Sequence, residues 1–262
     1  MTLDFHTHLF PDKLAEKTIA HLSEISGYAP NSDATVIGNM KVMDKCKIDK
    51  SVVCNIATNV KQTENVNRFA IEVDKNPRFV SFGSVHPDCD YKYYLALLQE
   101  NGIKGIKLHP DYQGFFIDDK KMGAIYEEIL KRDFVLIFHT GVDDGVGEPA
   151  HATPERIKNV IGMFRNEKVV LAHMGGFKMC EESAEKLIGE PIFLDTSCNE
   201  GFMPIEIFEK MIKEHGADRI LFGSDLPWTN PKVGLERVNL LNISNAEKEM
   251  ILGKNAEMLL SI

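Results

Sequence analysis

Short apolar runs alternate along the chain with segments in which apolar residues recur at helical spacing. Continuous apolar runs of this length are typical of buried strands, and recurrence every three or four residues is typical of amphipathic helices. Eight runs predict strands over residues 3–8, 51–57, 79–86, 102–109, 134–140, 169–174, 192–197 and 219–225. Helical patterns follow over residues 62–75, 91–100, 120–131, 154–164, 179–188, 204–215 and 246–260.

This alternation predicts an α/β fold. Eight strand and helix units in about 250 residues match the size and rhythm of a (β/α)8 TIM barrel, in which both faces of each strand are covered. We therefore expect a single barrel domain over residues 1–262. An open doubly wound sheet is the alternative, but no Gly-x-Gly-x-x-Gly follows the first strand, and no repeat or linker indicates a second domain.

The connection after the first strand is longer than the few residues that usually join such elements. Residues 11–26 and 35–47 each predict an amphipathic helix, and residues 27–33 separate them. This helical insert leaves strand 1 at the expected barrel mouth, so it should overhang that mouth. It could act as a lid that excludes water, or it could be a packing element without motion.

Four of the predicted strands end in residues that commonly bind metals. The first carries His6 and His8, which are two positions apart and therefore point to the same face. The fifth, sixth and eighth end at His139, His173 and Asp225. A barrel brings these strand ends around one mouth, whereas an open sheet would scatter them. Because burying so many polar groups costs free energy unless partners satisfy them, the set predicts a metal site.

The remaining histidines have simpler interpretations. We expect His21 and His215 on solvated helix surfaces. His86 precedes a proline at the end of the third strand, and packing there is favoured over a functional role. His151 lies in a long acidic, glycine-containing loop, where packing and substrate contact are both compatible with the sequence.

Together these motifs resemble the amidohydrolase superfamily. The similarity is to its amidohydrolase 2 group of metal-dependent hydrolases, which is related to aminocarboxymuconate semialdehyde decarboxylase. It spans the whole chain and rests on Asp-Phe-His-Thr-His at 4–8, Phe-His-Thr-Gly at 138–141, Ala-His-Met-Gly-Gly at 172–176, Gly-Ser-Asp-Leu-Pro-Trp at 223–228 and Gly-Lys-Asn-Ala at 253–256. The combination of these motifs is specific.

The resemblance implies a catalytic divalent ion, most often Zn²⁺, with one coordination position open for water. Its ligands would be His6, His8, His139 and Asp225. Asp225 would also accept a proton from the metal-activated water. His173 would stabilise the developing oxyanion, or it would ligate a second metal.

Strand four leaves two interpretations open. Lys107 and His109 are two residues apart and should both face the barrel interior. In binuclear relatives such as dihydroorotase, a similar Lys-Leu-Tyr-Pro carries a carboxylated lysine that bridges two metals. The resemblance therefore makes Lys107, His109 and His173 candidates for a second metal or for substrate binding, and we favour Lys107 as a cationic contact for a substrate carboxylate. Trp228 would line the substrate pocket or serve in packing.

Charge and cysteine content narrow the class of protein. The net charge of −9 and pI of about 5.5 argue against a general nucleic-acid or anionic-membrane surface. Five cysteines without a Cys-x-x-Cys pair indicate neither a disulfide framework nor a thiolate zinc knot. No apolar run approaches the roughly 20 residues of a membrane span. We therefore expect a cytoplasmic enzyme with a small-molecule substrate and neither a nucleic-acid nor a membrane partner.

The leading expectation for function is a metal-dependent hydrolase. It would use metal-activated water to cleave an amide, ester or lactone bond in a small anionic substrate. One alternative is a metal-dependent non-oxidative decarboxylase, a lyase that acts on a small carboxylic acid. Another is a metal-binding barrel without catalysis. The sequence leaves the substrate and the oligomeric state open, a homo-oligomer included.

Overall fold

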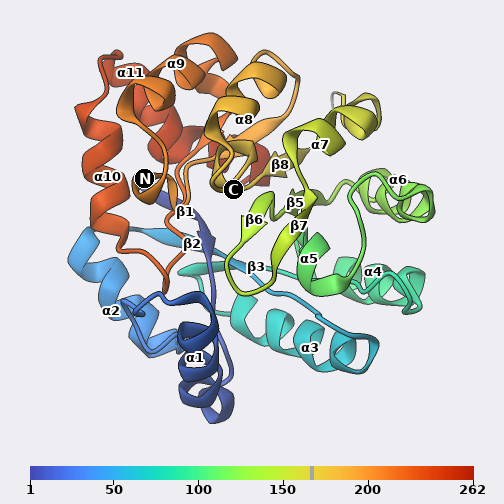
Figure 1. Cartoon of the computed structure of the whole chain (residues 1–262). Helices are drawn as coiled ribbons and strands as arrows, with labels where there is room; N and C mark the ends of the chain where they lie inside the picture. The colour runs from blue at the N-terminus through green and yellow to red at the C-terminus, as the bar shows by residue number, and fades with distance from the viewer. Residues whose placement is uncertain (166–167) are drawn as a thin grey trace.

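The strands of the computed structural model follow one another in chain order around the centre of the molecule (Figure 1). The structure describes residues 1–165 and 168–262. One parallel sheet contains β1 (Leu3–Thr7), β2 (Lys50–Cys54) and β3 (Phe79–Phe82). The other contains β4 (Gly105–Leu108), β5 (Val135–Phe138), β8 (Val169–Leu171), β9 (Phe193–Asp195) and β10 (Ile220–Leu221).

Backbone pairing continues across both edges where the two sheets meet. A parallel bridge joins Gly83, just after β3, to Ile106 in β4. At the other edge a parallel bridge joins Thr7 in β1 to Leu226, which follows β10. The strands therefore succeed one another in a ring, and the predicted TIM-barrel fold is confirmed over the open-sheet alternative.

Helices surround the strands, as alternating strand and helix patterns predict (Figure 1). The α-helices after the insert are α3 (Thr63–Asp74), α4 (Tyr91–Glu100), α5 (Pro110–Gln113), α6 (Gly123–Lys131), α7 (Pro154–Val160), α8 (Cys180–Leu187), α9 (Ile205–His215), α10 (Pro231–Leu240), α11 (Asn245–Glu249) and α12 (Asn255–Leu260). Short 3₁₀ turns lie at Val60–Gln62, Lys120–Met122, Ile161–Met163, His173–Gly175, Asn199–Gly201 and Ala217–Arg219, and a π-helical turn spans Met250–Lys254. The sequence pattern missed α5 and α10 and gave the last three helical pieces as one helix.

The predicted insert forms α1 (Asp12–Ser26) and α2 (Val36–Cys46). The insert lies against the segments that follow β1 and β10, as expected for a segment that overhangs the mouth. Asn39 Nδ2 donates a hydrogen bond to His8 O at 3.0 Å, and Asn31 N donates to Pro227 O at 2.7 Å. These bonds tie the insert to the two chain segments that carry His6, His8 and Asp225.

A β-hairpin that the sequence analysis missed follows β5. Its strands are β6 (Gly141–Asp143) and β7 (Gly147–Ala152), which pair antiparallel near the middle of the view in Figure 1. The segment lacks the apolar alternation that marks a half-buried strand. Gly141 has a φ of +88°, and a Cβ there would lie 2.1 Å from Phe177 N. Only glycine therefore allows the chain to turn this closely past Phe177.

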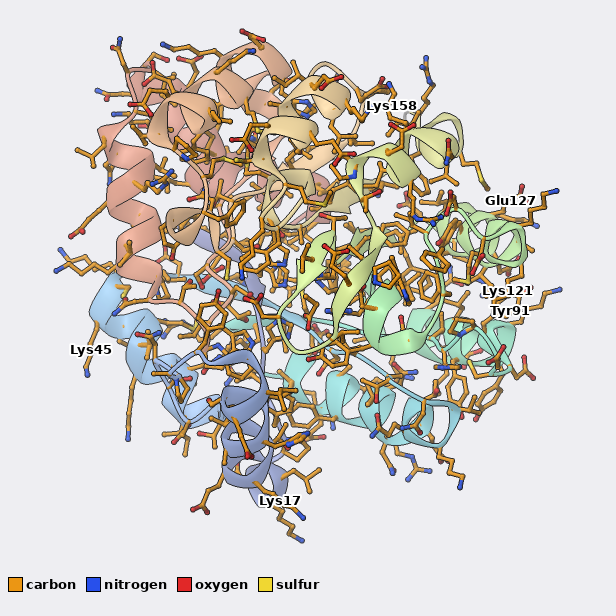
Figure 2. The ribbon with its side chains drawn as sticks, in the orientation of Figure 1. Lys17, Lys45, Tyr91, Lys121, Glu127 and Lys158 are labelled. Atoms are coloured by element: carbon orange, nitrogen blue, oxygen red, sulfur yellow. The ribbon has the colours of Figure 1, made fainter. Side chains whose placement is uncertain are left out.

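Apolar side chains fill the barrel and the layer beneath the helices. The residues predicted as strand ends lie mostly just beyond the observed strands, where the backbone leaves the sheet. On the outside, charged side chains point away from the helices, as Figure 2 shows for Lys17, Lys45, Lys121, Glu127 and Lys158. In the described ranges no helix combines the length and apolar character that crossing a membrane requires.

Candidate functional site

His6, His8 and Asp225 converge where β1 and the loop after β10 meet. His8 Nε2 lies 2.9 Å from Asp225 Oδ1, and His6 Nε2 lies 3.5 Å from the same oxygen. The ligand atoms of these three residues all lie within 4.8 Å of one another. The period-two spacing in β1 and the parallel bridge to the β10 segment produce this convergence.

The His6 and His8 rings each form a hydrogen bond through Nδ1, the nitrogen that does not face Asp225. These bonds determine which ring nitrogen carries a proton. His8 Nδ1 lies 2.9 Å from Cys54 O, and His6 Nδ1 lies 2.8 Å from Asp195 Oδ2. Because both partners only accept hydrogen bonds, each Nδ1 is the protonated donor and each Nε2 carries a lone pair. Two lone pairs and a carboxylate oxygen thus face one another.

This arrangement of acceptors fits a bound cation. Asp225 Oδ1 is buried and forms no hydrogen bond in the part of the chain that the structure describes. Burial acts to raise the pKa of Asp225, but His6 and His8 outweigh burial and hold this pKa well below its ordinary value. Nitrogen and carboxylate donors of this kind are suited to Zn²⁺ and similar divalent ions.

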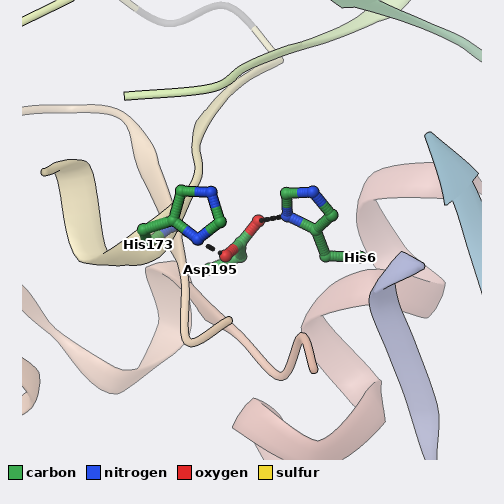
Figure 3. Close-up of side chains that lie close together, drawn as sticks. All are labelled: His6, His173 and Asp195. Carbon is green, nitrogen blue, oxygen red and sulfur yellow. Dashed lines mark hydrogen bonds and ion pairs between the residues drawn. The ribbon is translucent and has the colours of Figure 1, made fainter. Parts of the chain in front are cut away.

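Asp195, at the end of β9, is the residue that the sequence analysis missed. It lies between His6 and His173 (Figure 3), accepting from the His6 ring and, at 3.0 Å, from the backbone N of His173. Burial would raise the pKa of Asp195, yet the two histidines and Ser197 lower it overall. Its position at a strand end, like that of Asp225, was the available signal.

The His173 ring lies beside the His6 ring, and the His139 ring lies beside the His173 ring. His173 Nδ1 lies 3.2 Å from Ser197 O, so it is the protonated nitrogen and Nε2 carries the lone pair. His173 Nε2 lies 3.1 Å from His139 Nδ1, which therefore donates. His139 Nε2 is left as a buried acceptor without a hydrogen-bond partner among the described residues. Its lone pair is available, although His139 lies one ring beyond the His6, His8 and Asp225 group.

His109 belongs to a neighbouring cluster. Its ring stacks on that of His139, with centroids 4.1 Å apart and planes 8° apart. His109 Nε2 lies 3.3 Å from Asp143 Oδ2 on the β6–β7 hairpin. The Tyr112 ring lies edge-on to the His109 ring, with centroids 4.6 Å apart. The ligand atoms of His109, His139 and Asp143 all lie within 4.8 Å of one another, so these residues form a neighbouring group that could hold a cation. Asp143 and Tyr112 were not among the sequence candidates.

Lys107 points at the first group. Its Nζ lies 3.2 Å from His6 Nε2, and the residue is 1% exposed. No carboxylate of residues 1–165 or 168–262 lies within ion-pair distance of this Nζ. The expectation that Lys107 and His109 both face the site therefore agrees with the geometry, while the role of each remains a prediction.

Trp228 lies beside the site segment rather than in the histidine cluster. It is half-buried, its N donates to Asp225 O at 2.8 Å, and its carbonyl oxygen accepts from Asn31 Nδ2 at 3.3 Å. These backbone contacts link the insert to the Asp225 loop. A substrate-wall role for the indole stays a prediction.

Three further residues, Asp4, Ser224 and Gly223, hold the segments of the candidate ligands in register. Asp4 accepts from Ser224 N at 2.8 Å and from Ser224 Oγ at 2.5 Å, which fixes the residue before Asp225 to β1. Burial raises the pKa of Asp4 to about 7, although the Ser224 bonds act to lower it. Gly223 permits the close approach, because a Cβ there would lie 3.0 Å from His6 Cβ.

Burial favours the neutral ring in four of the site histidines, which are His6, His109, His139 and His173. Burial, and secondarily the Lys107 charge, lower the pKa of His6 to about 4. Burial is also the main cause that lowers the pKa values of His109, His139 and His173. Neutral imidazole is the form that binds a metal.

The remaining histidines lie outside this cluster. His21 is exposed, as expected. The prediction for His215 is wrong, because His215 is buried, with Nε2 2.9 Å from Ile192 O and Nδ1 accepting from Gly189 N. The helical pattern placed it on α9 but could not show that this end of the helix packs on the segment before β9. His86 accepts from Asp88 N in a turn, and His151 packs on Phe116.

Comparisons with known proteins agree with this architecture. Solved structures that match include a 2,6-dihydroxybenzoate decarboxylase in complex with 2,6-dihydroxybenzoate (18% identity, TM-score 0.74, covering 100% of this chain and 99% of the other). An uncharacterised TIM-barrel protein from Bordetella bronchiseptica has 20% identity and a TM-score of 0.79 (99% and 98% coverage). A dihydroxybenzoic acid decarboxylase from Polaromonas sp. JS666, with bound manganese and an inhibitor, has 17% identity and a TM-score of 0.73 (99% and 96% coverage).

At these identities the structural matches establish the fold alone. No curated protein matches the sequence. The family model described as amidohydrolase matches residues 4–262, which include all of the candidate site residues described above. The chain therefore belongs to the amidohydrolase family and is an enzyme of that family.

Proposed function

We propose that this protein is a divalent-metal-dependent hydrolase that acts on a small anionic substrate. The observation that carries the proposal is the set of unprotonated acceptors formed by His6 Nε2, His8 Nε2 and Asp225 Oδ1. Lys107 Nζ lies 3.2 Å from His6 Nε2, but Asp225 Oδ1 has no donor among the described residues. Burying such an acceptor is unfavourable unless a cation satisfies it. His139, whose buried Nε2 has no hydrogen bond in the described ranges, is proposed as the fourth ligand.

Zn²⁺ is the proposed ion, because nitrogen and carboxylate donors are common in catalytic zinc sites. When bound, such an ion supplies Lewis-acid polarisation of a substrate oxygen and increases the acidity of water. Asp225 would receive the proton that leaves the attacking water. His173, whose ring is fixed by Ser197, would lie where it can stabilise negative charge on the substrate oxygen.

Lys107 supports an anionic substrate. A buried ammonium without a carboxylate partner is unfavourable, and a substrate carboxylate would supply the missing counter-charge. In this proposal the Lys107 side chain holds the substrate, and Asp225 moves the proton. Water exclusion would come from the insert loop and the β6–β7 hairpin, which Tyr28 Oη and Asp144 Oδ2 join by a hydrogen bond of 2.9 Å.

Non-oxidative decarboxylation is the second candidate. Two of the similar structures named above are decarboxylases of hydroxybenzoic acids, and one of these contains manganese. Lys107 would bind the carboxylate of a hydroxybenzoic acid as well as the carboxylate of a lactone substrate. The manganese in that protein also makes Mn²⁺ the alternative ion to Zn²⁺ here.

A product-based assay tests the proposal and separates the two reactions. The Zn²⁺- and Mn²⁺-loaded proteins would be incubated with a panel of small lactone and ester carboxylates and with 2,6-dihydroxybenzoate. Hydrolysis in ¹⁸O-labelled water puts one label into the new carboxylate, whereas decarboxylation releases carbon dioxide without label in the organic product. We expect label incorporation that depends on metal. Carbon dioxide release alone would favour the lyase, and binding of neither metal would overturn both.

A further inference from the structure

We propose that His173, Cys198 and Asp225 form a second cation subsite, selective for thiophilic divalent ions such as Zn²⁺, beside the His6, His8 and Asp225 group. The inference rests on the proposed metal-dependent function and extends it. An ion at this subsite would engage His173 Nε2 and Asp225 Oδ2, so the form with one ion, in the first group, carries out the proposed reaction. It assigns a role to Cys198, a residue that neither the sequence motifs nor the proposed reaction uses.

The two oxygens of Asp225 face different partners. Oδ1 lies 2.9 Å from His8 Nε2 and 3.5 Å from His6 Nε2. Oδ2 lies 3.1 Å from Cys198 Sγ. A carboxylate placed in this way can bridge two cations, one on each oxygen. The ligand atoms of His173, Cys198 and Asp225 all lie within 4.8 Å of one another, as do those of the first group.

The segment after β9 supplies both the thiol and the support for the imidazole. Cys198 has a left-handed backbone with a φ of +55°, which directs its side chain to Asp225 instead of continuing the strand. Ser197 Oγ lies 2.9 Å from His173 Nδ1, and the Ser197 carbonyl accepts from the same nitrogen. His173 therefore presents Nε2 as its lone-pair nitrogen. A cation at Nε2 would replace the hydrogen bond that His139 Nδ1 donates there.

The two oxygens of the buried Asp225 carboxylate differ in how far protein donors satisfy them. Asp225 is 8% exposed, and its Oδ1 forms no hydrogen bond among the described residues. Oδ2 has the Cys198 thiol as its donor. Cation binding at the subsite would displace the thiol proton, which would leave to solvent, and the new thiolate would add the negative charge that a second cation needs.

The donor set determines which ions this subsite prefers. One imidazole nitrogen, one thiolate sulfur and one carboxylate oxygen suit Zn²⁺, Co²⁺ and Cd²⁺, whereas Mn²⁺ and Mg²⁺ prefer oxygen ligands. The first group contains no sulfur and accepts ions of either kind. We therefore expect two Zn²⁺ or Co²⁺ ions per chain but only one Mn²⁺ ion.

Titration of the full-length metal-free protein with Co²⁺ tests this. The visible d–d bands report binding at any site, and a near-ultraviolet sulfur-to-cobalt charge-transfer band reports thiolate ligation. We expect the charge-transfer band to grow with the second equivalent. Cys198→Ser should lose this band and bind one Co²⁺ ion fewer, while still binding one Mn²⁺ ion. The matched control Cys89→Ser should behave as the unchanged protein.

Serine at position 198 also separates ligation from hydrogen bonding. The serine hydroxyl can still donate to Asp225 Oδ2. If Cys198 only positions Asp225, the Zn²⁺ stoichiometry of Cys198→Ser should therefore be unchanged. A thiolate ligand predicts a loss of Zn²⁺ and Co²⁺ binding at one site, with Mn²⁺ binding unaffected. Circular dichroism of both variants shows whether the fold is retained.

A measurement on the unsubstituted protein avoids dependence on any variant. Alkylation of Cys198 by iodoacetamide, followed by peptide mass spectrometry, should be slowed at least tenfold, or about 1.4 kcal/mol, by Zn²⁺ but not by Mn²⁺. Binding of one Co²⁺ ion without a thiolate band, or equal protection by both ions, would overturn the second subsite and leave the proposed function intact. Absence of any bound Co²⁺ would overturn both.

Discussion

Asp195 Oδ2 lies 2.8 Å from His6 Nδ1, so a carboxylate from β9 fixes the tautomer of a proposed ligand histidine from β1. Both residues are buried, and the acceptor leaves the lone pair of His6 on Nε2, the nitrogen that Lys107 Nζ approaches to 3.2 Å. Such outer hydrogen bonds orient a ligand and increase its basicity. The residue pair is 189 positions apart in sequence, and the barrel alone brings it together.

Asp195→Asn should weaken metal binding without removing any direct ligand. The amide oxygen of asparagine is a poorer acceptor than a carboxylate oxygen. The amide NH₂ group can also point at His6 Nδ1, so that two donors face each other. We expect the Zn²⁺ affinity to fall by about 10- to 100-fold, measured by competition with a chromophoric chelator. Asp133→Asn, which changes an exposed carboxylate paired with Lys168, is the control. Equal affinities for the two variants would contradict the role of Asp195.

Removing a proposed ligand should lower metal content directly. His6→Ala and His139→Ala should each lose metal in elemental analysis after dialysis, because each removes a buried lone pair from the site. His21→Ala, at an exposed position of α1, should retain the metal content of the unchanged protein. Full metal content in His139→Ala would remove that residue from the ligand set and leave His6, His8 and Asp225.

Asp225→Asn should separate ligation from proton transfer. An amide oxygen can still approach the cation, but it cannot take a proton from water. Turnover of the substrate identified by the product assay should therefore fall on the order of 100- to 10,000-fold, further than metal content falls. Measured kcat at full metal loading gives the comparison. Turnover within a few-fold of the unchanged enzyme would make Asp225 a ligand only.

Lys107→Ala distinguishes a substrate-binding lysine from a carboxylated, metal-bridging one. A lysine that contacts the substrate anion contributes uniform binding, so KM should rise while metal content stays constant. This is the outcome we expect. Loss of one metal ion, with partial rescue by added short carboxylic acids, would instead identify a lysine carbamate. Lys104→Ala is the control, because Lys104 lies just before β4, the strand that contains Lys107.

His215 predicts a pH dependence of stability. Burial lowers its pKa below the ordinary value of 6.5, so the unfolded chain binds a proton there more readily than the folded protein. The stabilisation by neutral His215 is therefore present above pH 6.5 and is lost as pH falls toward the lowered pKa. His215→Gln should lower the free energy of unfolding by roughly 1 to 3 kcal/mol at pH 7.5. In urea titrations this deficit should shrink at pH 5.5.

The exposed His21 provides the comparison for that pH series. His21→Gln should leave the free energy of unfolding within about 0.5 kcal/mol at both pH values. A deficit for His215→Gln that is constant between pH 7.5 and 5.5 would show that protonation of His215 is not coupled to folding.

The sequence by itself determined the fold class and named most of the candidate site residues that the structure brings together. Hydrophobic runs and helical spacing are local properties, and they identified the eight strands and most of the surrounding helices. His6, His8, His173 and Asp225 could be found because a barrel places the ends of its strands around one mouth. The same local signal misplaced His215, since amphipathic spacing does not specify which neighbour covers the end of α9.

Only the tertiary structure decided which residues meet across the mouth. The link from His6 to Asp195, the stacking of His109 on His139 and the contact between Cys198 and Asp225 join different strands, and no spacing along the chain encodes them. The β6–β7 hairpin was also invisible, because backbone pairing and a single glycine contact form it instead of an apolar pattern. The periodicity of the sequence specifies which face of its strand or helix a residue occupies. The closure of the barrel specifies which residues of other strands lie opposite it.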